Sequence, residues 1–275
     1  MADPAEPPHS WDLRADLELG LELADLADSI TKRWWRDPTL AVRRKPDGSP
    51  VTPADVQVED ALRLRLATAR PDDAVLGEEQ GVSGSFGSRR TWVLDPIDGT
   101  SHFARGRTGF ATLIALVTDG VPVVGIVAMP GRGLRWWGAV GIGAHSTEGS
   151  LRVSAAASFA DASIAYAGPL RWAEEGKQAA LQAIETEAAE LYPVADVGLF
   201  CDVAEGRADA ALAPYGAVWD LAAPYALITA AGGVCTDLSG NARADGGSLV
   251  AAGPALHART LAALGAPAPP PPPSS

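Results

Sequence analysis

The sequence predicts a mixed α and β protein built in two halves, an antiparallel α+β half followed by an α/β half. Two helix-period segments precede a series of apolar strands, and the two longest strands are joined by Asp119 and Gly120, a favoured hairpin turn. From about Leu151 onward, short apolar runs alternate with helical patterns, as they do in α/β proteins. A chain of 275 residues that is 47% hydrophobic is long enough to bury such a core.

Two helices are predicted before the first strand. Residues 11–35 carry leucines and alanines at helical spacing. The second helix is predicted to begin at Thr52, which can cap it, with Pro53 at the first helical position and Asp55 three residues after the cap. It is expected to run to about Ala69, and the turn-rich segment KPDGSPVTP separates it from the first helix.

Strands follow in the first half and alternate with helices in the second. The first half is predicted to contain the strands DAVLG, TWVLD, GFATLIALVTDG, VPVVGIVAMPG and RWWGAVGIGAH. In the second half, strand and helix are predicted to alternate through SIAYAG, a helix over residues 173–190, GLFCDVAEG, ADAALAP and a helix from Asp220. The chain is expected to close with GGVCTDL, SLVAAG and a helix through PALHARTLAAL.

These elements place the two halves at residues 11–150 and 151–265. The flanking segments 1–10 and 266–275 are rich in proline and poor in large apolar residues, so we expect both to be disordered tails. No apolar run approaches the roughly 20 residues needed to span a bilayer, and the first residues do not have the pattern of a secretory leader. The sequence therefore predicts a cytoplasmic protein without a membrane partner.

Charge and cysteine content exclude several classes of function. A net charge of −12 argues against a nucleic-acid partner, because binding to phosphate backbones requires a basic patch. Cys201 and Cys235 lie far apart without a CxxC pairing, so we interpret them as core residues of a protein in a reducing compartment. Where carboxylates converge on one pocket, divalent cations are the usual means of offsetting their repulsion.

Acidic residues stand where predicted elements end or begin. The segments concerned are LGEE (76–79), DPID (95–98) and WD (219–220). In DPID a turn allows both carboxylates, of Asp95 and Asp98, and the Ile97 carbonyl to face one point, and Mg²⁺ takes such oxygen ligands at roughly 2.0–2.1 Å. Gly99 and Thr100 then offer backbone N–H groups at a predicted helix start, which suits phosphate.

Each of these positions also has an ordinary structural interpretation. Asp55 and Asp220 can each cap a helix. Glu78 and Glu79 can lie in a solvated loop, and Asp98 can belong to a common turn with the glycine that follows it. Taken singly, the ordinary interpretations are favoured. Together, four separate acidic positions next to apolar strand ends favour one shared metal site.

Four motifs in this order resemble a known family. They are VTPAD (51–55), GEE (77–79), WVLDPIDGTSHF (91–102) and WDLAAPYALITAAGG (219–233). The set is similar to that of the inositol monophosphatase superfamily of magnesium-dependent, lithium-sensitive phosphatases, and the resemblance covers nearly the whole folded chain. It implies an α+β fold of the layered αβαβα sandwich type, with the site between the two halves, and a homodimer. His102 stands where the family usually has asparagine, which we interpret as a local hydrogen-bonding substitute.

The resemblance also implies the metal ligands. Glu78, Asp95 and the Ile97 carbonyl would hold one Mg²⁺, and Asp95, Asp98 and Asp220 a second, with two or three ions per site. Glu78 would thereby count among the catalytic residues. Cleavage of a phosphate monoester is the activity that the family performs, so the expected partner is a small phosphorylated substrate.

The remaining site residues are implied in the same way. Thr100 and Asp55 would form the dyad that positions and deprotonates the attacking water. Gly99 and Thr100 would bind phosphate through their backbone. Glu79 and Lys45 would have supporting roles, although an exposed, solvated Lys45 in a flexible turn is an equal alternative.

The substrate prediction depends on two positions. RWW at residues 135–137 is similar to a segment common in the histidinol-phosphate phosphatases of the superfamily. An equal alternative is that the two tryptophans only pack in the core. Inositol-handling members usually carry a glutamate seven residues before the WD aspartate, where this chain has Ala213. We therefore expect L-histidinol phosphate as the substrate, with inositol-1-phosphate or another small sugar or polyol phosphate as the alternative.

Two further functions are weaker. A catalytically silent metal-binding protein is disfavoured because the set of expected ligands is intact. A nucleotide 3′-phosphatase is disfavoured because such relatives are usually longer, and nothing in the sequence indicates an adenine pocket.

Overall fold

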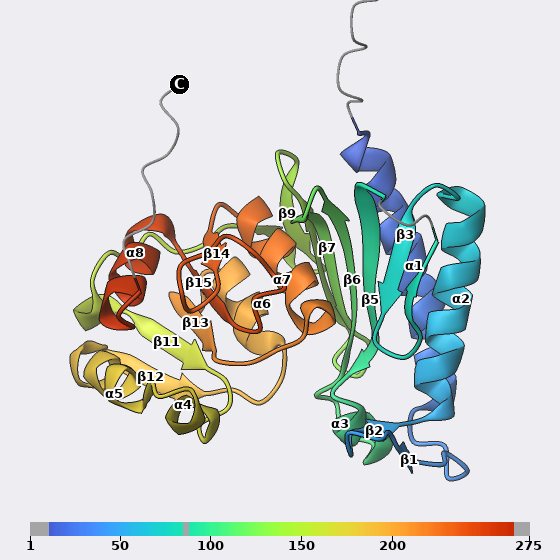
Figure 1. The fold of residues 1–275 in the computed structure, drawn as a ribbon, viewed down its shortest axis with the longest axis horizontal. Coiled ribbons are helices and arrows are strands. Elements are labelled where there is room, and N and C mark those ends of the chain that lie inside the picture. Colours follow the sequence, from blue (N-terminus) through green and yellow to red (C-terminus); the bar gives the residue numbers. More distant parts are fainter. Residues whose placement is uncertain (1–10, 85–87, 267–275) are drawn as a thin grey trace, which may run out of the picture.

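The structure, a computed structural model, describes residues 11–84 and 88–266. Its elements stack as helix, sheet, helix, sheet and helix layers (Figure 1). This arrangement confirms the predicted αβαβα sandwich. The predicted tails lie outside the described residues, apart from Ala266. None of the described helices is both long and apolar enough to cross a bilayer.

The first layer consists of two helices, α1 (Leu13–Trp34) and α2 (Pro53–Ala69). The Asp12 side chain caps α1 by accepting hydrogen bonds from the backbone N–H groups of Arg14 and Ala15. Leu23 of α1 and Leu62 of α2 are fully buried, because their helices cover one face of the first sheet. Both helices were predicted within two residues at each end.

The second layer is an eight-stranded sheet in the order β10-β9-β8-β7-β6-β5-β3-β4. Its strands are β3 (Ala74–Gly77), β4 (Gly81–Ser83), β5 (Arg90–Asp98), β6 (Ala111–Thr118), β7 (Val121–Met129), β8 (Leu134–Ala139), β9 (Gly143–Ser146) and β10 (Gly149–Leu151). All pairs are antiparallel except β3 with β5. The predicted hairpin between β6 and β7 is confirmed, and Asp119 and Gly120 at its turn both have positive φ, 51° and 83°.

The middle layer is formed by α6 (Gly198–Ala204) and α7 (Val218–Ala230), which lie between the two sheets (Figure 1). α7 contacts β5, β6 and β7 of the first sheet and β14 and β15 of the second. The predicted helix from Asp220 is thus confirmed and begins two residues earlier. The division of the chain into halves at Leu151 stays a prediction.

The second sheet has five strands in the order β12-β11-β13-β15-β14. Its strands are β11 (Ser163–Tyr166), β12 (Glu190–Pro193), β13 (Ala210–Ala213), β14 (Val234–Thr236) and β15 (Leu249–Ala252). The outer helices α4 (Arg171–Glu174), α5 (Gln178–Glu187) and α8 (Pro254–Ala263) and the short 3₁₀ helix η1 (Phe159–Asp161) complete the sandwich.

The single helix predicted over 173–190 is wrong. Helix α4 ends at Glu174, and Gly176, with φ 65°, turns the chain in a left-handed conformation before α5 begins at Gln178. Residues Glu190–Pro193 then form strand β12, which pairs in parallel with β11. Two short strands in the turn-rich segment, β1 (Arg43–Arg44) and β2 (Pro50–Val51), were not predicted either.

Candidate active site

A bulge at the end of β5 presents the two aspartates of DPID. Asp95 pairs with Leu113 of β6 and Asp98 with Ala111, so two residues of β5 between them have no partner in register. The Thr112 hydroxyl donates to the carbonyl of Pro96 at 2.8 Å and fixes the bulge. The bulge places both carboxylates at the C-terminal end of β5, an inner strand of the sheet.

Gly99 turns the chain from this bulge into helix α3 (Thr100–Ala104). It has φ 77° and ψ 38°, and a Cβ added there would lie 2.8 Å from the carbonyl oxygen of Gly109. Glycine is therefore required at this position. The first helical N–H groups, which begin at Thr100, have no acceptor within α3 and suit an anion.

Asp220 reaches the same point from the first turn of α7. One of its oxygens accepts a hydrogen bond from the backbone N–H of Ala217 at 2.8 Å, so Asp220 does cap its helix. Its carboxylate also lies with those of Asp95 and Asp98, and one oxygen from each falls within 4.8 Å of the others. The capping interpretation and the cluster are therefore both compatible with the structure.

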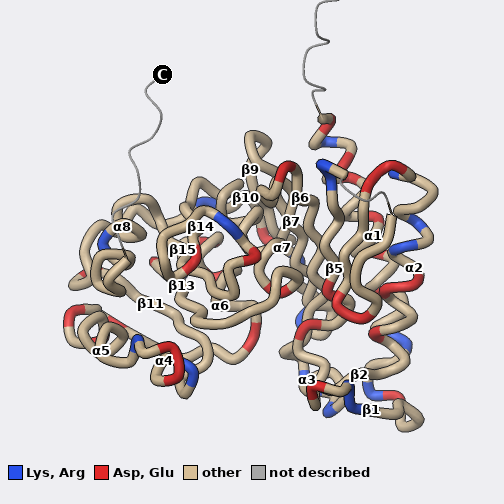
Figure 2. The backbone as a smooth tube through the Cα atoms, in the orientation of Figure 1, with Lys and Arg blue, Asp and Glu red and all other residues tan. Residues whose placement is uncertain are grey.

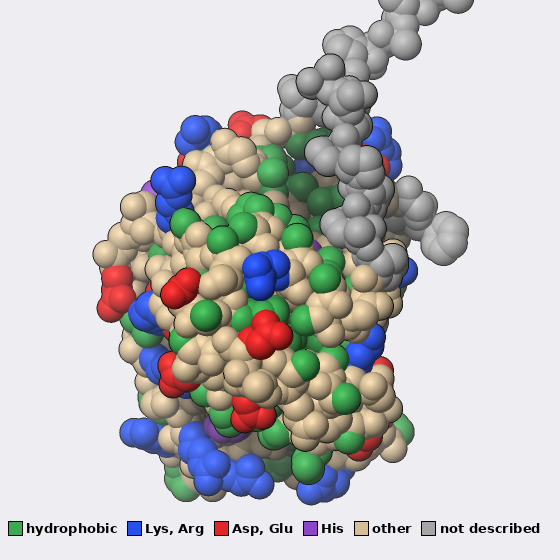
Figure 3. Space-filling view, turned by 90° about the vertical axis from the view of Figure 1, so that its left-hand side faces the viewer, with side chains coloured by type: hydrophobic (Ala, Val, Ile, Leu, Met, Phe, Trp, Pro, Cys, Tyr) green, Lys and Arg blue, Asp and Glu red, His purple; other side chains and the backbone are tan. Residues whose placement is uncertain are grey.

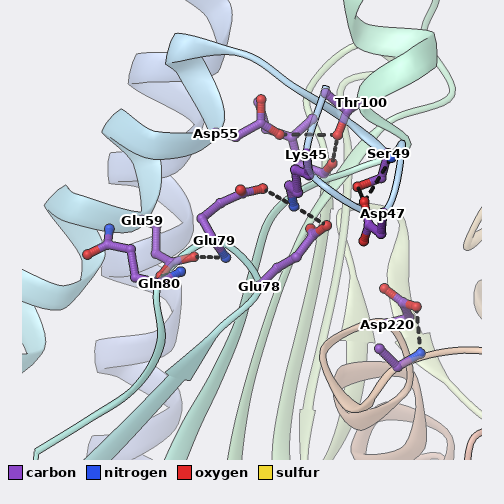
Figure 4. Close-up of polar contacts among 12 residues, drawn as sticks. Lys45, Asp47, Ser49, Asp55, Glu59, Glu78, Glu79, Gln80, Thr100 and Asp220 are labelled. Atoms are coloured by element: carbon purple, nitrogen blue, oxygen red, sulfur yellow. Dashed lines mark hydrogen bonds and ion pairs between the residues drawn. The ribbon is translucent and has the colours of Figure 1, made fainter. Parts of the chain in front are cut away.

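Asp55 also combines two contacts. Its Oδ2 accepts hydrogen bonds from the backbone N–H and the hydroxyl of Thr52, at 2.8 and 2.6 Å, which completes the capping box of α2. Its Oδ1 is 3.2 Å from the hydroxyl of Thr100 (Figure 4). The Thr100 hydroxyl is also 3.1 Å from the carbonyl oxygen of Ile97, so its single proton has two available acceptors. Burial raises the pKa of Asp55.

Lys45 lies in the β1–β2 hairpin and contacts both acids of the GEE motif. Its ammonium is 2.8 Å from a carboxylate oxygen of Glu78 and 2.8 Å from one of Glu79 (Figure 4). Burial opposes the charge of Lys45, but the two carboxylates outweigh it and raise its pKa. Burial also raises the pKa of Glu79 to about 7. Lys45 is thus not an exposed, solvated side chain, and Glu78 is oriented toward it rather than into the three-aspartate cluster.

Glu59 holds the GEE turn in place, a role that the sequence did not suggest. It is fully buried on α2, one turn after Asp55, and accepts hydrogen bonds from the backbone N–H groups of Glu79 and Gln80 at 2.9 and 3.1 Å (Figure 4). Arg63 neutralises it at 2.8 Å. The spacing of four between Asp55 and Glu59 was the available signal, because it places both on one helix face.

The electrostatics of the aspartate cluster are unfavourable without a cation. Burial, and then the neighbouring carboxylates, raise the pKa of Asp95 well above its ordinary range and the pKa of Asp98 to about 7. The Oδ1 atom of Asp95 is buried without a hydrogen-bond partner. Three converging carboxylates with an unpaired buried oxygen fit a hard divalent cation such as Mg²⁺.

Two adjoining cavities meet at this cluster. The catalytic cavity, of about 220 Å³, contains most of the expected site; its lining residues include Glu78, Asp95, Ile97, Asp98, Gly99, Thr100 and Asp220. A second cavity, of about 100 Å³, shares Asp98 and Asp220 with it. That cavity is mainly apolar but contains Asp196, and Ala213 lines it as well.

Asp196 was missed at the sequence level. It precedes α6, its Oδ1 accepts the backbone N–H of Gly198 at 3.0 Å, and its Oδ2 forms an ion pair with Arg132. His102 lies nearby, since its ring and the Asp196 carboxylate both approach Gly109. An isolated acid in YPVADVGLF carries no motif, so only the fold reveals its position.

The RWW segment lies outside both cavities. Arg135 forms ion pairs with Asp25 and Asp28 of α1 at 2.7 and 3.0 Å, and buried Trp136 donates its indole N–H to Glu205. The packing interpretation therefore accounts for this segment. Cys201 and Cys235 are both buried and free, which agrees with their interpretation as core residues.

Comparison with known proteins places this geometry in a family. Residues 14–266 match the model of the inositol monophosphatase family. A histidinol-phosphatase of Mycobacterium tuberculosis is 42% identical over 91% of this chain and 98% of its own length. An inositol-1-monophosphatase of Mycobacterium leprae is 38% identical over 82% of this chain and 81% of its own length. An inositol monophosphatase from Zymomonas mobilis has a similar structure, with a TM-score of 0.80 and 31% identity over 93% of this chain and 99% of that one. The chain belongs to the inositol monophosphatase family and is a phosphoric monoester hydrolase.

Proposed function

We propose that this phosphatase hydrolyses L-histidinol phosphate, a reaction of histidine biosynthesis. The observation that carries the proposal is that Asp196 and Ala213 both line the cavity beside the aspartate cluster. Histidinol phosphate is a cation beyond its phosphate, so a carboxylate in that cavity would attract its ammonium or imidazole group. At Ala213 a methyl group replaces an acid that could accept hydrogen bonds from inositol hydroxyls, so those hydroxyls would lose a partner at about 1–3 kcal/mol each. The similarity to a histidinol-phosphatase along nearly the whole chain supports the same substrate.

We propose two or three Mg²⁺ ions as the cofactor. Glu78, Asp95 and the carbonyl of Ile97 would hold one ion, and Asp95, Asp98 and Asp220 a second. For Glu78 this requires its carboxylate to contact the ion as well as Lys45. The bound cations would neutralise phosphate charge, lower the pKa of water and stabilise the leaving oxygen.

The dyad of Thr100 and Asp55 would act on the attacking water. The Thr100 hydroxyl can donate its proton to Asp55 Oδ1, at 3.2 Å, and its oxygen can then accept a hydrogen bond from water. As the water oxygen attacks phosphorus, its proton passes to this pair, and the phosphorus–oxygen ester bond breaks so that the leaving oxygen departs with the bonding electrons and takes a proton from solvent to form the alcohol. Thr52 holds the other oxygen of Asp55, so the carboxylate cannot turn away. The backbone of Gly99 and Thr100 would bind the phosphate oxygens.

Lys45 and Glu79 would have supporting roles. Lys45 bridges the two glutamates at 2.8 Å from each, which lowers the repulsion between them. Glu79, held by the GEE turn, would keep Lys45 beside the cavity. We expect loss of Lys45 to weaken cation binding at Glu78 rather than to remove a proton-transfer group.

The test is a phosphate-release panel in excess Mg²⁺ that compares kcat/KM for histidinol phosphate, inositol-1-phosphate, fructose-1,6-bisphosphate, glycerol-2-phosphate and adenosine 3′,5′-bisphosphate. Histidinol phosphate should give the highest value. Another compound turned over tenfold better would refute the substrate but leave the chemistry intact. Inositol-1-phosphate is the specific alternative, since the Mycobacterium leprae relative is named for it.

Two variants test the recognition argument directly. Asp196→Asn should raise KM for histidinol phosphate about tenfold, the loss of one charge-assisted contact, while the kinetics with glycerol-2-phosphate stay unchanged. Arg132→Ala removes the ion-pair partner of Asp196 and leaves the carboxylate. If Asp196 only anchors Arg132, the two variants should behave alike, and the recognition role would be refuted.

We also propose a homodimer located in the cytoplasm. The dimer is expected from the family resemblance, and the location from the composition of the chain. Light scattering on the purified protein tests the first, and cell fractionation tests the second.

A further inference from the structure

Five exposed arginines lie on segments near the catalytic cavity, and two of them line a cavity that adjoins it. We call them the arginine rim; they are Arg36, Arg43, Arg44, Arg105 and Arg107. They come from the end of α1, the β1 strand and the residues just after α3, which lie together at one end of the molecule (Figure 2). None of the five forms an ion pair with any of the described residues.

Ten of the fourteen other arginines of the chain, by contrast, form ion pairs with described residues. Arg90, for example, contacts two aspartates and Arg135 two more. On the face of the molecule drawn in Figure 3, acidic and basic side chains are interspersed. In a protein with a net charge of −12, a group of unpaired positive charges is an unusual feature.

Three of the rim arginines donate hydrogen bonds to backbone carbonyls, which do not neutralise their charge. Arg44 donates to the carbonyl of Gly48 at 2.7 Å, and Arg105 to the carbonyl of Ser101 at 3.4 Å. Arg36 donates to the carbonyl of Gly106 at 3.1 Å.

Two acids lie in the same region, and neither forms an ion pair with the rim. Asp37 accepts hydrogen bonds from the backbone and hydroxyl of Thr39. Asp47 does the same with Ser49. The net charge of the region, counting the five arginines against these two acids, is positive.

A further cavity, lined by two rim arginines, adjoins the catalytic cavity. It has a volume of about 400 Å³ and is lined by Arg44 and Arg105 together with Val42, Pro50, Ser101 and Ala104. Pro50 and Ser101 also line the catalytic cavity, so the two spaces adjoin. An anion between Arg44 and Arg105 would thus stand next to the phosphate position expected at Thr100.

The physical need for such a site follows from the charge of the protein. A phosphate monoester carries about −1.5 to −2 charges at neutral pH, and the net field of the protein repels it. At physiological salt, exposed charges act only within about 8 Å, so local positive groups decide whether the anion reaches the cavity. A positively lined cleft of this kind can raise association rates by about 10- to 1,000-fold.

We propose that the arginine rim, through Arg44 and Arg105, is a landing site that binds the phosphate dianion of the incoming substrate before it enters the catalytic cavity. The same site binds inorganic phosphate as it leaves. The rim acts on the charge of the phosphate and not on the alcohol part of the substrate. It therefore contributes to kcat/KM for every phosphate monoester, whichever substrate is preferred.

The test uses the double variant Arg44→Ala/Arg105→Ala of the full chain, assayed with p-nitrophenyl phosphate in constant Mg²⁺. At low ionic strength kcat/KM should fall about tenfold, the lower end of steering effects, with kcat within twofold of wild type. Added KCl should shrink the difference between variant and wild type, because salt screens the rim. The inhibition constant of inorganic phosphate should rise in parallel.

Two further variants make the result specific. Arg44→Lys/Arg105→Lys keeps the charges and should retain kcat/KM within twofold. Arg14→Ala/Arg259→Ala removes two exposed arginines, from α1 and α8, that form no ion pair with described residues, and should leave kcat/KM unchanged. The proposal is overturned if the rim alanine variant matches wild type at low salt, if its defect persists unchanged in KCl, or if the lysine pair or the distant pair loses as much.

Discussion

Replacement of Asp98 by asparagine should stabilise the metal-free protein while it weakens binding of the ion proposed at Asp95, Asp98 and Asp220. The carboxylate of Asp98 has its pKa raised from 3.8 to about 7 by burial and by the charges of Asp220 and Asp196. Because the folded pKa lies above the unfolded one, ionisation of Asp98 favours the unfolded chain. The contribution of protonated Asp98 to the free energy of unfolding is fully present below the unfolded pKa and is lost as pH rises through the folded pKa.

The magnitude follows from the size of this shift. A change from 3.8 to about 7 is a little over three pH units, which corresponds to at most roughly 4 kcal/mol. Asp98 is partly exposed to solvent, and screening reduces the effect to about 1–2 kcal/mol. Asparagine has the same shape and cannot ionise, so Asp98→Asn should be more stable than wild type by this amount in EDTA at about pH 8.

Urea unfolding followed by tryptophan fluorescence measures the difference. At about pH 4 the difference should be small, since Asp98 is then protonated in the folded wild type and only partly ionised in its unfolded chain, and it should vanish below the unfolded pKa of 3.8. Excess MgCl₂ at the higher pH should stabilise the wild type more than the variant, which keeps only the proposed ion at Glu78, Asp95 and Ile97. As a control, Glu187→Gln removes one exposed charge on α5 and should change neither quantity.

Two results would contradict this reasoning. If Asp98→Asn is less stable than wild type in EDTA at about pH 8, the carboxylate is a structural contact and not a repelled charge. If MgCl₂ stabilises the variant as strongly as the wild type, Asp98 is not a ligand.

Four further outcomes are expected. Activity should disappear in excess EDTA, return with Mg²⁺ and be inhibited by Li⁺; turnover that persists in EDTA would refute the metal scheme. Asp220→Asn should abolish turnover with little loss of stability, because the amide oxygen can still accept the hydrogen bond from the Ala217 N–H; a near wild-type kcat would exclude Asp220 as a ligand. Thr100→Ala should slow hydrolysis by about 10²- to 10⁴-fold with Mg²⁺ affinity retained, and Thr100→Ser should restore most of the rate; lost Mg²⁺ affinity in the alanine variant would make Thr100 structural. Glu59→Gln should weaken Mg²⁺ binding by about 10- to 100-fold, measured by calorimetry, because the GEE turn loses its anionic anchor; unchanged affinity would leave Glu59 with a folding role alone.

Much of the architecture was accessible from local patterns. The helices α1 and α2 were predicted from periodicity and capping residues, and the β6–β7 hairpin from its turn. The region of residues 171–193 was not, because a break at one glycine and a four-residue strand leave almost no periodic signal. Strand β12 is recognisable only by its pairing with β11.

Local and tertiary functions coincide at two of the acidic positions. Asp55 and Asp220 were each expected either to cap a helix or to serve the site, and the structure shows that one carboxylate with two oxygens can contact both a helix N-terminus and the cavity. Sequence statistics set these interpretations against each other. The geometry makes them compatible.

The sequence by itself determined the chemistry of this protein, because the acids of the four motifs lie at element ends and their residue types limit what they can bind. Only the tertiary structure decided what surrounds that chemistry. Asp196, Glu59 and the arginine rim are brought to the site by contacts between segments far apart in the chain, and none of them stands in a motif. Residues that share one metal ion must lie at fixed distances from it, so they tend to occur in local sequence patterns. A charged acid or arginine instead interacts with a substrate electrostatically over several ångströms, and any element that the fold places nearby can supply it.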